Sequence, residues 1–394
     1  MKLVIISHTA HYRRDGEVVG WGPTVREIDE ISRMFDRVVH IAPMHSKENP
    51  ESALRYESPR IQLREVNPSG GVRVTDKLGI LFRLGSYLRA IVQELRDADA
   101  VHVRCPANIS LLALVILIFL RKPGRRWLKY AGSWCPPEPE PWSYTLQRWL
   151  LRRSWHRGLV TVNGYWPNQP SFVRSFFNPC LNRKERMKGR AESITKRMIE
   201  PVRLIFVGRL HSRKGVGRVL QIVARVKSSG CAVLLDVVGD GNERSKFEQM
   251  ADMLGIAKCV KFHGWLSRAA INPLYSQAHI SLLPSSSSEG WPKALSEAMA
   301  FGVVPLASNV SSIPQYLKKF GCGRAFAPSD VAAFADSILW YATHPEEWKG
   351  ESESCVKAAE LFDYRNHCMA VRTIFQIPVS RTVGTSMKSE ALKV

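Results

Sequence analysis

Residues 284–308 read PSSSSEGWPKALSEAMAFGVVPLAS, a stretch that predicts a loop, a helix and a strand in immediate succession. The serines predict a polar loop, and Pro292 is suited to the first position of a helix. Apolar residues at i, i+4 spacing follow and predict a helix that ends at the next glycine. The run VVPLAS then predicts a buried strand. Glu289 is therefore expected at a loop tip before the helix, and Glu297 inside it.

The same alternation of strand and helix recurs along the whole chain. Near-continuous Val, Ile and Leu runs are typical of parallel strands buried on both faces of a sheet. Their alternation with helical stretches predicts an α/β fold of two doubly wound, Rossmann-like units. The predicted strands are KLVIISH (2–8), RVVHIAP (37–43), IQLREV (61–66), AVHVRC (100–105), WLKYAG (127–132), LVTVNG (159–164), VRLIFVGRL (202–210), AVLLDVVGDG (232–241), VKFHGW (260–265), HISLLPS (279–285) and VVPLAS (303–308).

The 394 residues suffice for two domains of ordinary size. A polar, basic stretch over 178–200 predicts the boundary, so we expect an N-terminal domain over 1–190 and a C-terminal domain over 191–350. A helical segment is expected over 351–376. Residues 377–394 show no periodic pattern and are predicted to be a mobile tail.

Cysteine usage and the N-terminus predict a cytoplasmic location. The eight cysteines are scattered and form no CxxC pair, which argues against a zinc site or a disulfide framework and favours a reducing compartment. The first residues predict a strand and lack the features of a signal peptide. The longest apolar run, ISLLALVILIFL (109–120), is too short as a helix to cross a bilayer. We expect a buried core helix there, with an interfacial segment anchored by the following arginines as the alternative.

The net charge of +21 is unevenly distributed: residues 1–200 hold 33 Lys and Arg against 19 Asp and Glu. Such a balance suits an anionic membrane surface, nucleic acid or a negatively charged substrate. The basic clusters lack the interleaved aromatic residues of a single-strand-binding face, and no nucleic-acid motif accompanies them. We therefore predict peripheral association with the inner membrane face and no nucleic acid. A simply solvated surface is the alternative.

Two short motifs could contact a ligand at strand ends, the first of them a diphosphate. In FVGRLHSRKG (206–215) a strand runs into Arg209, and Lys214 precedes a helical pattern. The forked guanidinium and the point charge of an ammonium suit a diphosphate, and the helix N-terminus adds partial positive charge. In VVGDGNERSKFEQM (237–250) Gly239 allows a sharp turn and a close backbone approach, without the GxGxxG fingerprint. Ordinary basic residues at a strand end are the alternative for the first motif, and a plain tight turn is the alternative for the second.

Two further motifs supply hydrogen-bonding groups. In VKFHGW (260–265) backbone groups at Gly264 could read a nucleobase, although a packed aromatic residue is the commoner explanation. Glu289 and Glu297 are acceptors suited to sugar hydroxyls, with solvated surface acids as the alternative. Two acceptors and two cations suit a ligand that has hydroxyls at both ends and phosphates in the middle. A nucleotide sugar has this shape.

In this order and spacing the motifs VGRL-x3-KG, VGDG-x-E-R, F-x-G and EGWPKALSEAMAFGVVPLAS resemble the family-four retaining glycosyltransferases of the GT-B fold (glycosyltransferase group 1 type). The resemblance covers residues 202–328, and the Glu-x7-Glu pair is highly specific for this family when it occurs together with the other motifs. It implies an acceptor-binding N-terminal domain and a nucleotide-sugar-binding C-terminal domain that face each other across a cleft. It also implies that the segment 351–376 crosses back to the first domain.

The resemblance further implies a role for each matching position. Arg209 and Lys214 match the cations that bind the donor diphosphate, and with Glu289 they are the expected catalytic residues. Glu289 matches the glutamate that contacts the donor sugar, and Glu297 the one that holds the ribose hydroxyls. The other expected donor-binding positions contribute backbone groups or close approach: Gly22, Gly239, Gly264, Gly290, Trp291 and Pro292.

The implied function is transfer of a hexose from a nucleotide-diphosphate sugar to a saccharide or lipid-linked saccharide, in cell-surface or exopolysaccharide assembly. Neither a cofactor nor a metal is expected. The stretch KYAGSW (129–134) departs from the family because it lacks the histidine that many relatives carry there, so no residue in it is given a proton-transfer role. A sugar-nucleotide epimerase of the same architecture, or a non-catalytic basic protein that binds membranes or nucleic acid, are the alternatives.

Overall fold

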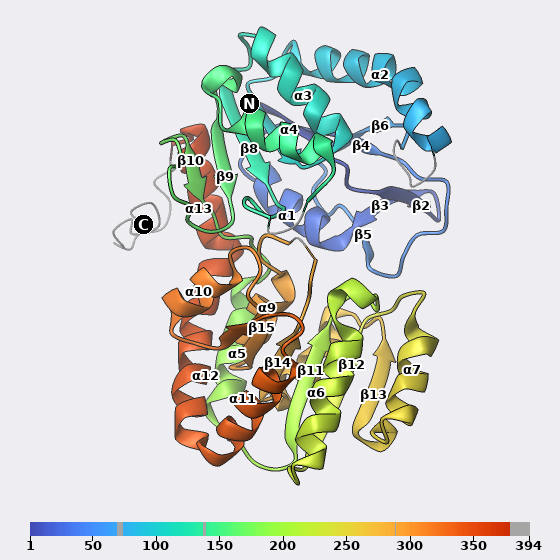
Figure 1. Cartoon of the computed structure of the whole chain (residues 1–394). Helices are drawn as coiled ribbons and strands as arrows, with labels where there is room; N and C mark the ends of the chain where they lie inside the picture. The colour runs from blue at the N-terminus through green and yellow to red at the C-terminus, as the bar shows by residue number, and fades with distance from the viewer. Residues whose placement is uncertain (69–73, 137–138, 288, 379–394) are drawn as a thin grey trace. The chain divides into compact units, whose positions relative to one another are not determined.

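The computed structural model describes residues 1–68, 74–136, 139–287 and 289–378, and the chain divides into two compact units (Figure 1). Residues 1–134, 138–177 and 364 onward form the first unit, and residues 178–363 form nearly all of the second. Each unit is built on its own parallel sheet, so the predicted α/β class with two Rossmann-like units is confirmed. From residue 379 on, the predicted tail lies outside the described residues.

The first unit contains a seven-stranded parallel sheet in the order β10-β9-β8-β7-β1-β4-β6. Six of these strands coincide with the apolar runs predicted in the first half of the chain. The strands are β10 (Val173–Ser175), β9 (Leu159–Val162), β8 (Arg125–Tyr130), β7 (Ala100–Cys105), β1 (Lys2–Ile6), β4 (Arg37–Pro43) and β6 (Ile61–Val66).

Helices cover both faces of this sheet because successive strand residues point to opposite sides. Leu3 and Ile5 of β1 pack in one core with α1 (Gly22–Ser32) and α13 (Tyr364–Phe375). Val4 and Ile6 pack in the other core with α2 (Val74–Leu95), α3 (Asn108–Phe119) and α4 (Trp142–Leu151). The predicted core helix 109–120 is therefore confirmed as α3, although Val115 and Phe119 on one side of it are exposed. No helix within the described ranges is long and apolar enough to cross a membrane.

The second unit contains a six-stranded parallel sheet in the order β13-β12-β11-β14-β15-β16. Its strands are β11 (Val202–Val207), β12 (Val233–Val238), β13 (Val260–Gly264), β14 (Ile280–Leu283), β15 (Val304–Ser308) and β16 (Arg324–Phe326). Its helices are α5 (Arg183–Ile194), α6 (Val216–Ser228), α7 (Arg244–Met253), α8 (Arg268–Gln277), α9 (Lys293–Met299), α10 (Ile313–Phe320), α11 (Val331–Thr343) and α12 (Pro345–Ala359).

The second unit begins earlier in the chain than the predicted boundary at residue 190. Helix α5 already belongs to it and starts at a capping box, in which Asn182 and Glu185 satisfy each other's backbone N–H groups. The segment predicted to be helical over 351–376 is divided: α12 belongs to the second unit, and α13 packs on α1 and β8 of the first.

Two local features differ from the predictions. A small antiparallel sheet of β2 (His11–Arg14), β3 (Glu17–Trp21) and β5 (Ala53–Arg55) was not predicted. Asp15 and Gly16 both have positive φ between β2 and β3, as the tight hairpin turn favoured by Asp-Gly requires. Pro292 does not begin α9 as predicted; it precedes the first helical residue, with an extended backbone at the N-cap position.

Candidate functional site

Three loops of the second unit follow the carboxyl ends of β11, β12 and β14, where open parallel sheets bind their ligands. These are the loops at 208–215, 239–243 and 284–292. Backbone hydrogen bonds join the first loop to the other two: Leu210 N donates to Asp240 O at 3.0 Å, and Ser286 N donates to Arg213 O at 2.9 Å. The loops that carry Arg209, Lys214, Gly239 and Glu289 are therefore joined by backbone hydrogen bonds.

Two glycines allow these loops to lie so close together. At Gly239, where φ is +128°, a Cβ would lie 2.0 Å from the carbonyl oxygen of Gly208. At Gly215, where φ is +87°, a Cβ would lie 2.1 Å from the carbonyl oxygen of Pro284. Both positions require glycine for conformation and for space. The close backbone approach predicted at Gly239 is thus an approach to the neighbouring loop.

Glu243 anchors the first loop and was given no role in the sequence analysis. Its carboxylate accepts a hydrogen bond from Ser212 N at 3.1 Å and a second from the Ser212 hydroxyl, and it lies 3.5 Å from His211 Nε2. The hydrogen bonds from Ser212 lower the pKa of Glu243 below its ordinary value. The sequence could have pointed to Glu243, because it is the glutamate of the VGDG-x-E motif.

Lys214 and Glu289 form an ion pair between the first and third loops. Lys214 is partly buried, and this burial together with the nearby charge of Arg209 lowers the pKa of Lys214 to about 8. The Glu289 carboxylate acts in the opposite direction because it stabilises the charged ammonium. Arg209 itself is exposed at the end of β11. Lys214 and Glu289 are thus in contact at the edge of the sheet, with the charge of Arg209 near Lys214.

Glu297 is held by Arg268, which the sequence analysis did not single out. Arg268 Nη2 donates to Glu297 Oε1 at 2.8 Å, and the same guanidinium donates to the carbonyl oxygen of Cys180 at 2.7 and 2.8 Å. Arg268 also lies 3.2 Å from Glu185. Because the guanidinium contacts Oε1, the Oε2 atom of Glu297 can accept a hydrogen bond from a ligand hydroxyl.

Gly290, Trp291 and Pro292 directly follow Glu289 in the third loop, and they differ in their capacity to bind a ligand. The Trp291 ring is 4% exposed, stacks on Phe362 at 5.5 Å and donates to Ser296 Oγ at 2.7 Å, so its side chain belongs to the core. Gly290 O accepts from the Ser312 hydroxyl. Pro292 has no N–H, so only the amides of Gly290 and Trp291 can donate in the predicted way.

The remaining predicted positions also make close backbone contacts. Gly264 ends β13 with a φ of +70°, and its carbonyl oxygen accepts from Gly239 N at 2.8 Å. In the first unit Gly22 begins α1 and donates to Ser52 O at 3.1 Å, where a Cβ would lie 2.6 Å from the same oxygen. Glycine at residue 22 is therefore required by the fold of the first unit itself.

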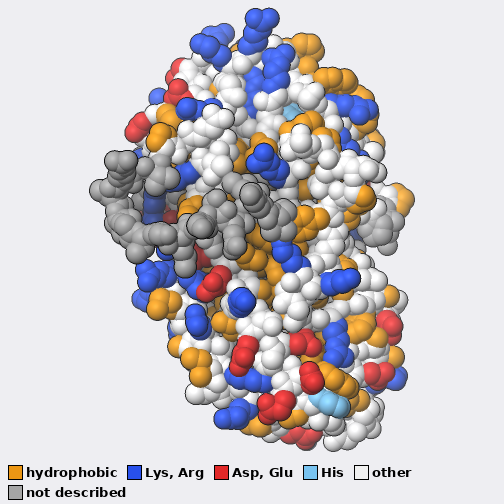
Figure 2. Space-filling model, turned by 90° about the vertical axis from the view of Figure 1, so that its left-hand side faces the viewer, with side chains coloured by type: hydrophobic (Ala, Val, Ile, Leu, Met, Phe, Trp, Pro, Cys, Tyr) orange, Lys and Arg blue, Asp and Glu red, His pale blue; other side chains and the backbone are white. Residues whose placement is uncertain are grey.

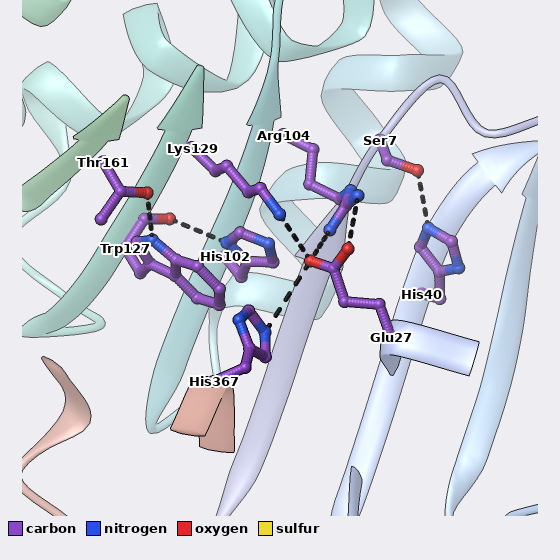
Figure 3. A network of polar contacts seen from close by, with 9 residues as sticks. All are labelled: Ser7, Glu27, His40, His102, Arg104, Trp127, Lys129, Thr161 and His367. Atoms are coloured by element: carbon purple, nitrogen blue, oxygen red, sulfur yellow. Dashed lines mark hydrogen bonds and ion pairs between the residues drawn. The ribbon is translucent and has the colours of Figure 1, made fainter. Parts of the chain in front are cut away.

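A buried charge cluster in the first unit was not predicted. Glu27 of α1 is fully buried, and its Oε1 lies 2.7 Å from Arg104 Nη1 and 2.7 Å from Lys129 Nζ (Figure 3). His367 Nε2 of α13 lies 3.9 Å from the same oxygen. These residues are far apart in sequence and come from two helices and two strands, so no local pattern links them.

A closed ring of hydrogen bonds lies at the end of β1, and two of its residues, Ser7 and His40, are drawn beside this cluster in Figure 3. His11 Nδ1 lies 2.8 Å from Thr9 O, which accepts only, so this nitrogen carries the proton. Burial lowers the pKa of His11 to about 4 and that of His40 well below its ordinary value, so both rings are neutral. The direction of the other bonds follows. The Tyr56 hydroxyl donates to His11 Nε2 and accepts from His40 Nδ1. The Ser7 hydroxyl donates to His40 Nε2 and accepts from Thr9 N, which closes the ring.

Known proteins resemble this chain in sequence and in fold. Residues 192–361 match the family described as Glycosyl transferases group 1. The amylovoran biosynthesis glycosyltransferase AmsK of Erwinia amylovora is 29% identical over 145 residues, which are 36% of this chain and 36% of AmsK. The matched part thus spans about a third of the length of this curated relative.

Solved structures resemble the chain over almost its full length. Sucrose-phosphate synthase from Thermosynechococcus elongatus has a TM-score of 0.70 at 15% identity, over 95% of this chain and 98% of that one. Anabaena HepE, solved in complex with UDP and glucose, has a TM-score of 0.65 at 14% identity, over 96% and 100% of the two chains. The predicted fold of GT-B glycosyltransferases is therefore confirmed.

Proposed function

We propose that the chain, whose residues 192–361 match the group 1 glycosyltransferases, transfers a hexose from a nucleotide-diphosphate sugar to a saccharide or lipid-linked saccharide, with retention of configuration. The observation that carries the proposal is the convergence of Arg209, Lys214 and Glu289 at the carboxyl edge of the second sheet, with Glu297 on the adjoining helix. The family resemblance derived from the motifs is confirmed; the reaction, donor and acceptor are the proposal.

The two cations stabilise the departing diphosphate. Breaking the sugar–phosphate bond leaves negative charge on the nucleotide, and preorganised cations that meet this charge lower the barrier. Arg209 is exposed and can reach a ligand from solution, while Lys214 is already oriented by Glu289. Binding of the diphosphate to Lys214 loosens its pair with Glu289, and this carboxylate is then available to the hydroxyls of the donor sugar.

Glu297 holds the ribose through the oxygen that Arg268 does not contact. The complex of Anabaena HepE with UDP and glucose supports a uridine nucleotide and a hexose as the first donors to test. The name of AmsK supports a role in polysaccharide assembly. Because Arg209 and Lys214 supply the positive charge that the leaving group needs, we propose that neither a metal nor a cofactor takes part, and that the reaction occurs in the cytoplasm.

The test is a transfer assay with UDP-glucose, UDP-galactose, GDP-mannose and ADP-glucose, each with simple saccharide acceptors and with a lipid-linked acceptor. We expect one donor to give a new glycosidic linkage whose anomeric configuration, read by NMR, equals that of the donor. Glu289→Gln and Lys214→Ala are expected to abolish transfer without unfolding the chain. Wild-type turnover in both variants would refute the site, and an inverted product would refute retention.

The epimerase and the non-catalytic binding protein are not favoured by these findings. An epimerase would convert the donor sugar without an acceptor, so the same assay performed without acceptor distinguishes it.

A further inference from the structure

A basic and aromatic surface of the first unit has no part in the proposed reaction. Residues 100–177 contain eleven Lys and Arg against two Asp and Glu, a net charge of +9 out of +21 for the chain. Several of these cations are buried, but Arg121, Lys122, Arg125, Arg152, Arg153, Arg157 and Arg174 are exposed. The segment also exposes large apolar side chains, which charged surfaces usually avoid.

The apolar side chains gather where α3 ends and the turn η1 (Ser154–His156) lies. Phe119 at the end of α3 is 80% exposed, Trp149 of α4 is 42% exposed, and Trp155 of η1 is 48% exposed. The two tryptophan rings contact each other edge to face at 5.3 Å, and the Arg153 guanidinium lies over the Trp149 ring at 5.0 Å. An arginine on an exposed tryptophan keeps its charge near the apolar group.

One buried arginine joins these elements into a single surface. Arg126 donates to Leu117 O and Leu120 O at the end of α3, to Pro123 O in the following loop, and to His156 O in η1. The end of α3 and the loop after it, which carry Phe119, Arg121 and Lys122, are thereby joined to η1, which carries Trp155. Figure 2 shows Lys and Arg side chains adjoining hydrophobic ones at the end of the molecule drawn uppermost, which belongs to the first unit.

We propose that this surface, defined as Phe119, Trp149, Trp155, Arg121, Lys122 and Arg153, docks on an anionic lipid bilayer. Tryptophan and phenylalanine insert at the boundary between headgroups and acyl chains, while neighbouring cations meet the negative surface. A folded acidic protein would match the charge but would leave Phe119 without the apolar layer that its exposure suits. Single-stranded nucleic acid is a different class of partner and is an outcome of the test.

The inference is independent of the transfer reaction, because docking is measured without donor or acceptor. It adds to the proposed function a surface that would hold the enzyme beside a lipid-linked acceptor. If vesicle binding fails while transfer to a saccharide succeeds, only the docking surface is refuted. If transfer fails while vesicles bind, only the proposed function is refuted.

The experiment is flotation of the full chain with vesicles of phosphatidylglycerol and phosphatidylcholine in equal parts, compared with pure phosphatidylcholine. We expect binding to the anionic vesicles alone. Each cation near an anionic surface contributes about a fivefold change in partitioning, so Arg121→Glu with Lys122→Glu should weaken binding at least about tenfold. Phe119→Ser should weaken it at least about threefold.

Matched controls lie on the second unit. Met253 is 81% exposed, close to the value for Phe119, and Lys258 and Lys261 are both exposed. Met253→Ser likewise removes a highly exposed apolar side chain, Lys258→Glu with Lys261→Glu changes the net charge by the same amount, and both should leave flotation unchanged. Equal loss in test and control variants would show non-specific attraction. Failure of the wild-type chain to float, or retention by single-stranded DNA in place of vesicles, would overturn the proposal.

Discussion

Glu27 offers the sharpest test of how burial determines the energy of charged contacts in this protein. Its carboxylate is fully buried and lies 2.7 Å from both Arg104 and Lys129. The Arg13–Glu65 pair of the same unit is equally close at 2.6 Å, but its side chains are 59% and 40% exposed. The two sites therefore differ in burial and in the number of cations, while the contact distance is nearly constant.

The expected cost of Glu27→Gln follows from this burial. The substitution keeps the shape of the side chain and removes its charge, so two cations remain in a site with little water. Breaking a buried ion pair on one side costs about 3–5 kcal/mol. Exposed pairs contribute about 0–1 kcal/mol, so Glu65→Gln should cost less than about 1 kcal/mol. For a unit of this size 1 kcal/mol lowers Tm by about 2–4 °C, so Glu27→Gln should lower it by roughly 6–20 °C.

The assay is differential scanning calorimetry of the wild type and both variants at one pH. Because the two units can unfold separately, hydrogen exchange of peptides from β7 and β8 assigns the changed transition to the first unit. The result that would refute the reasoning is a Glu27→Gln transition no lower than that of Glu65→Gln. In that case the contact distance, and not burial, would determine how much an ion pair stabilises this protein.

Three further predictions concern particular side chains. The pKa of Lys214 is lowered to about 8, so its ammonium loses its charge as the pH rises through that value. The affinity for UDP, measured by calorimetric titration, should therefore be highest well below pH 8 and fall above it. Lys214→Arg should show no such fall, because its guanidinium stays charged. Arg268→Met should raise the donor KM about threefold or more at unchanged kcat, because Glu297 loses its orientation. Arg268→Lys should recover part of the lost affinity. A lower kcat at constant KM would contradict this prediction. Tyr56→Phe leaves buried ring nitrogens of His11 and His40 without their hydrogen-bond partner, so it should lower the free energy of unfolding by about 1–3 kcal/mol. An unchanged Tm in thermal unfolding would contradict a stabilising role of this hydrogen-bond ring.

The parallel sheets could be predicted because their strands are buried on both faces and therefore appear as continuous apolar runs. β1, β4, β11 and β14 illustrate this, since each follows the predicted run within a few residues. The antiparallel strands β2, β3 and β5 are short and partly polar, so hydropathy gave no signal for them. The Asp15–Gly16 pair could have predicted their hairpin.

The site was predictable only as far as its motifs are local in sequence. Arg209, Lys214 and Glu289 follow strand ends, and parallel strands bring such ends to one edge of a sheet. Arg268 could not be predicted, because its contact with Glu297 depends on how α8 and α9 pack. The Glu27 cluster is missing from the sequence analysis for the same reason: burial of a charged side chain is a property of the folded unit.

The central claim is that a nucleotide-diphosphate sugar binds at the edge of the second sheet, with Lys214 on its diphosphate and Glu297 on its ribose. The most direct measurement is calorimetric titration of UDP, GDP and ADP into the wild type, Lys214→Ala and Glu297→Ala. We expect one nucleotide to bind, and each substitution to weaken its binding at least about tenfold because each removes one charge-assisted hydrogen bond. Equal affinity of that nucleotide for all three proteins would contradict it.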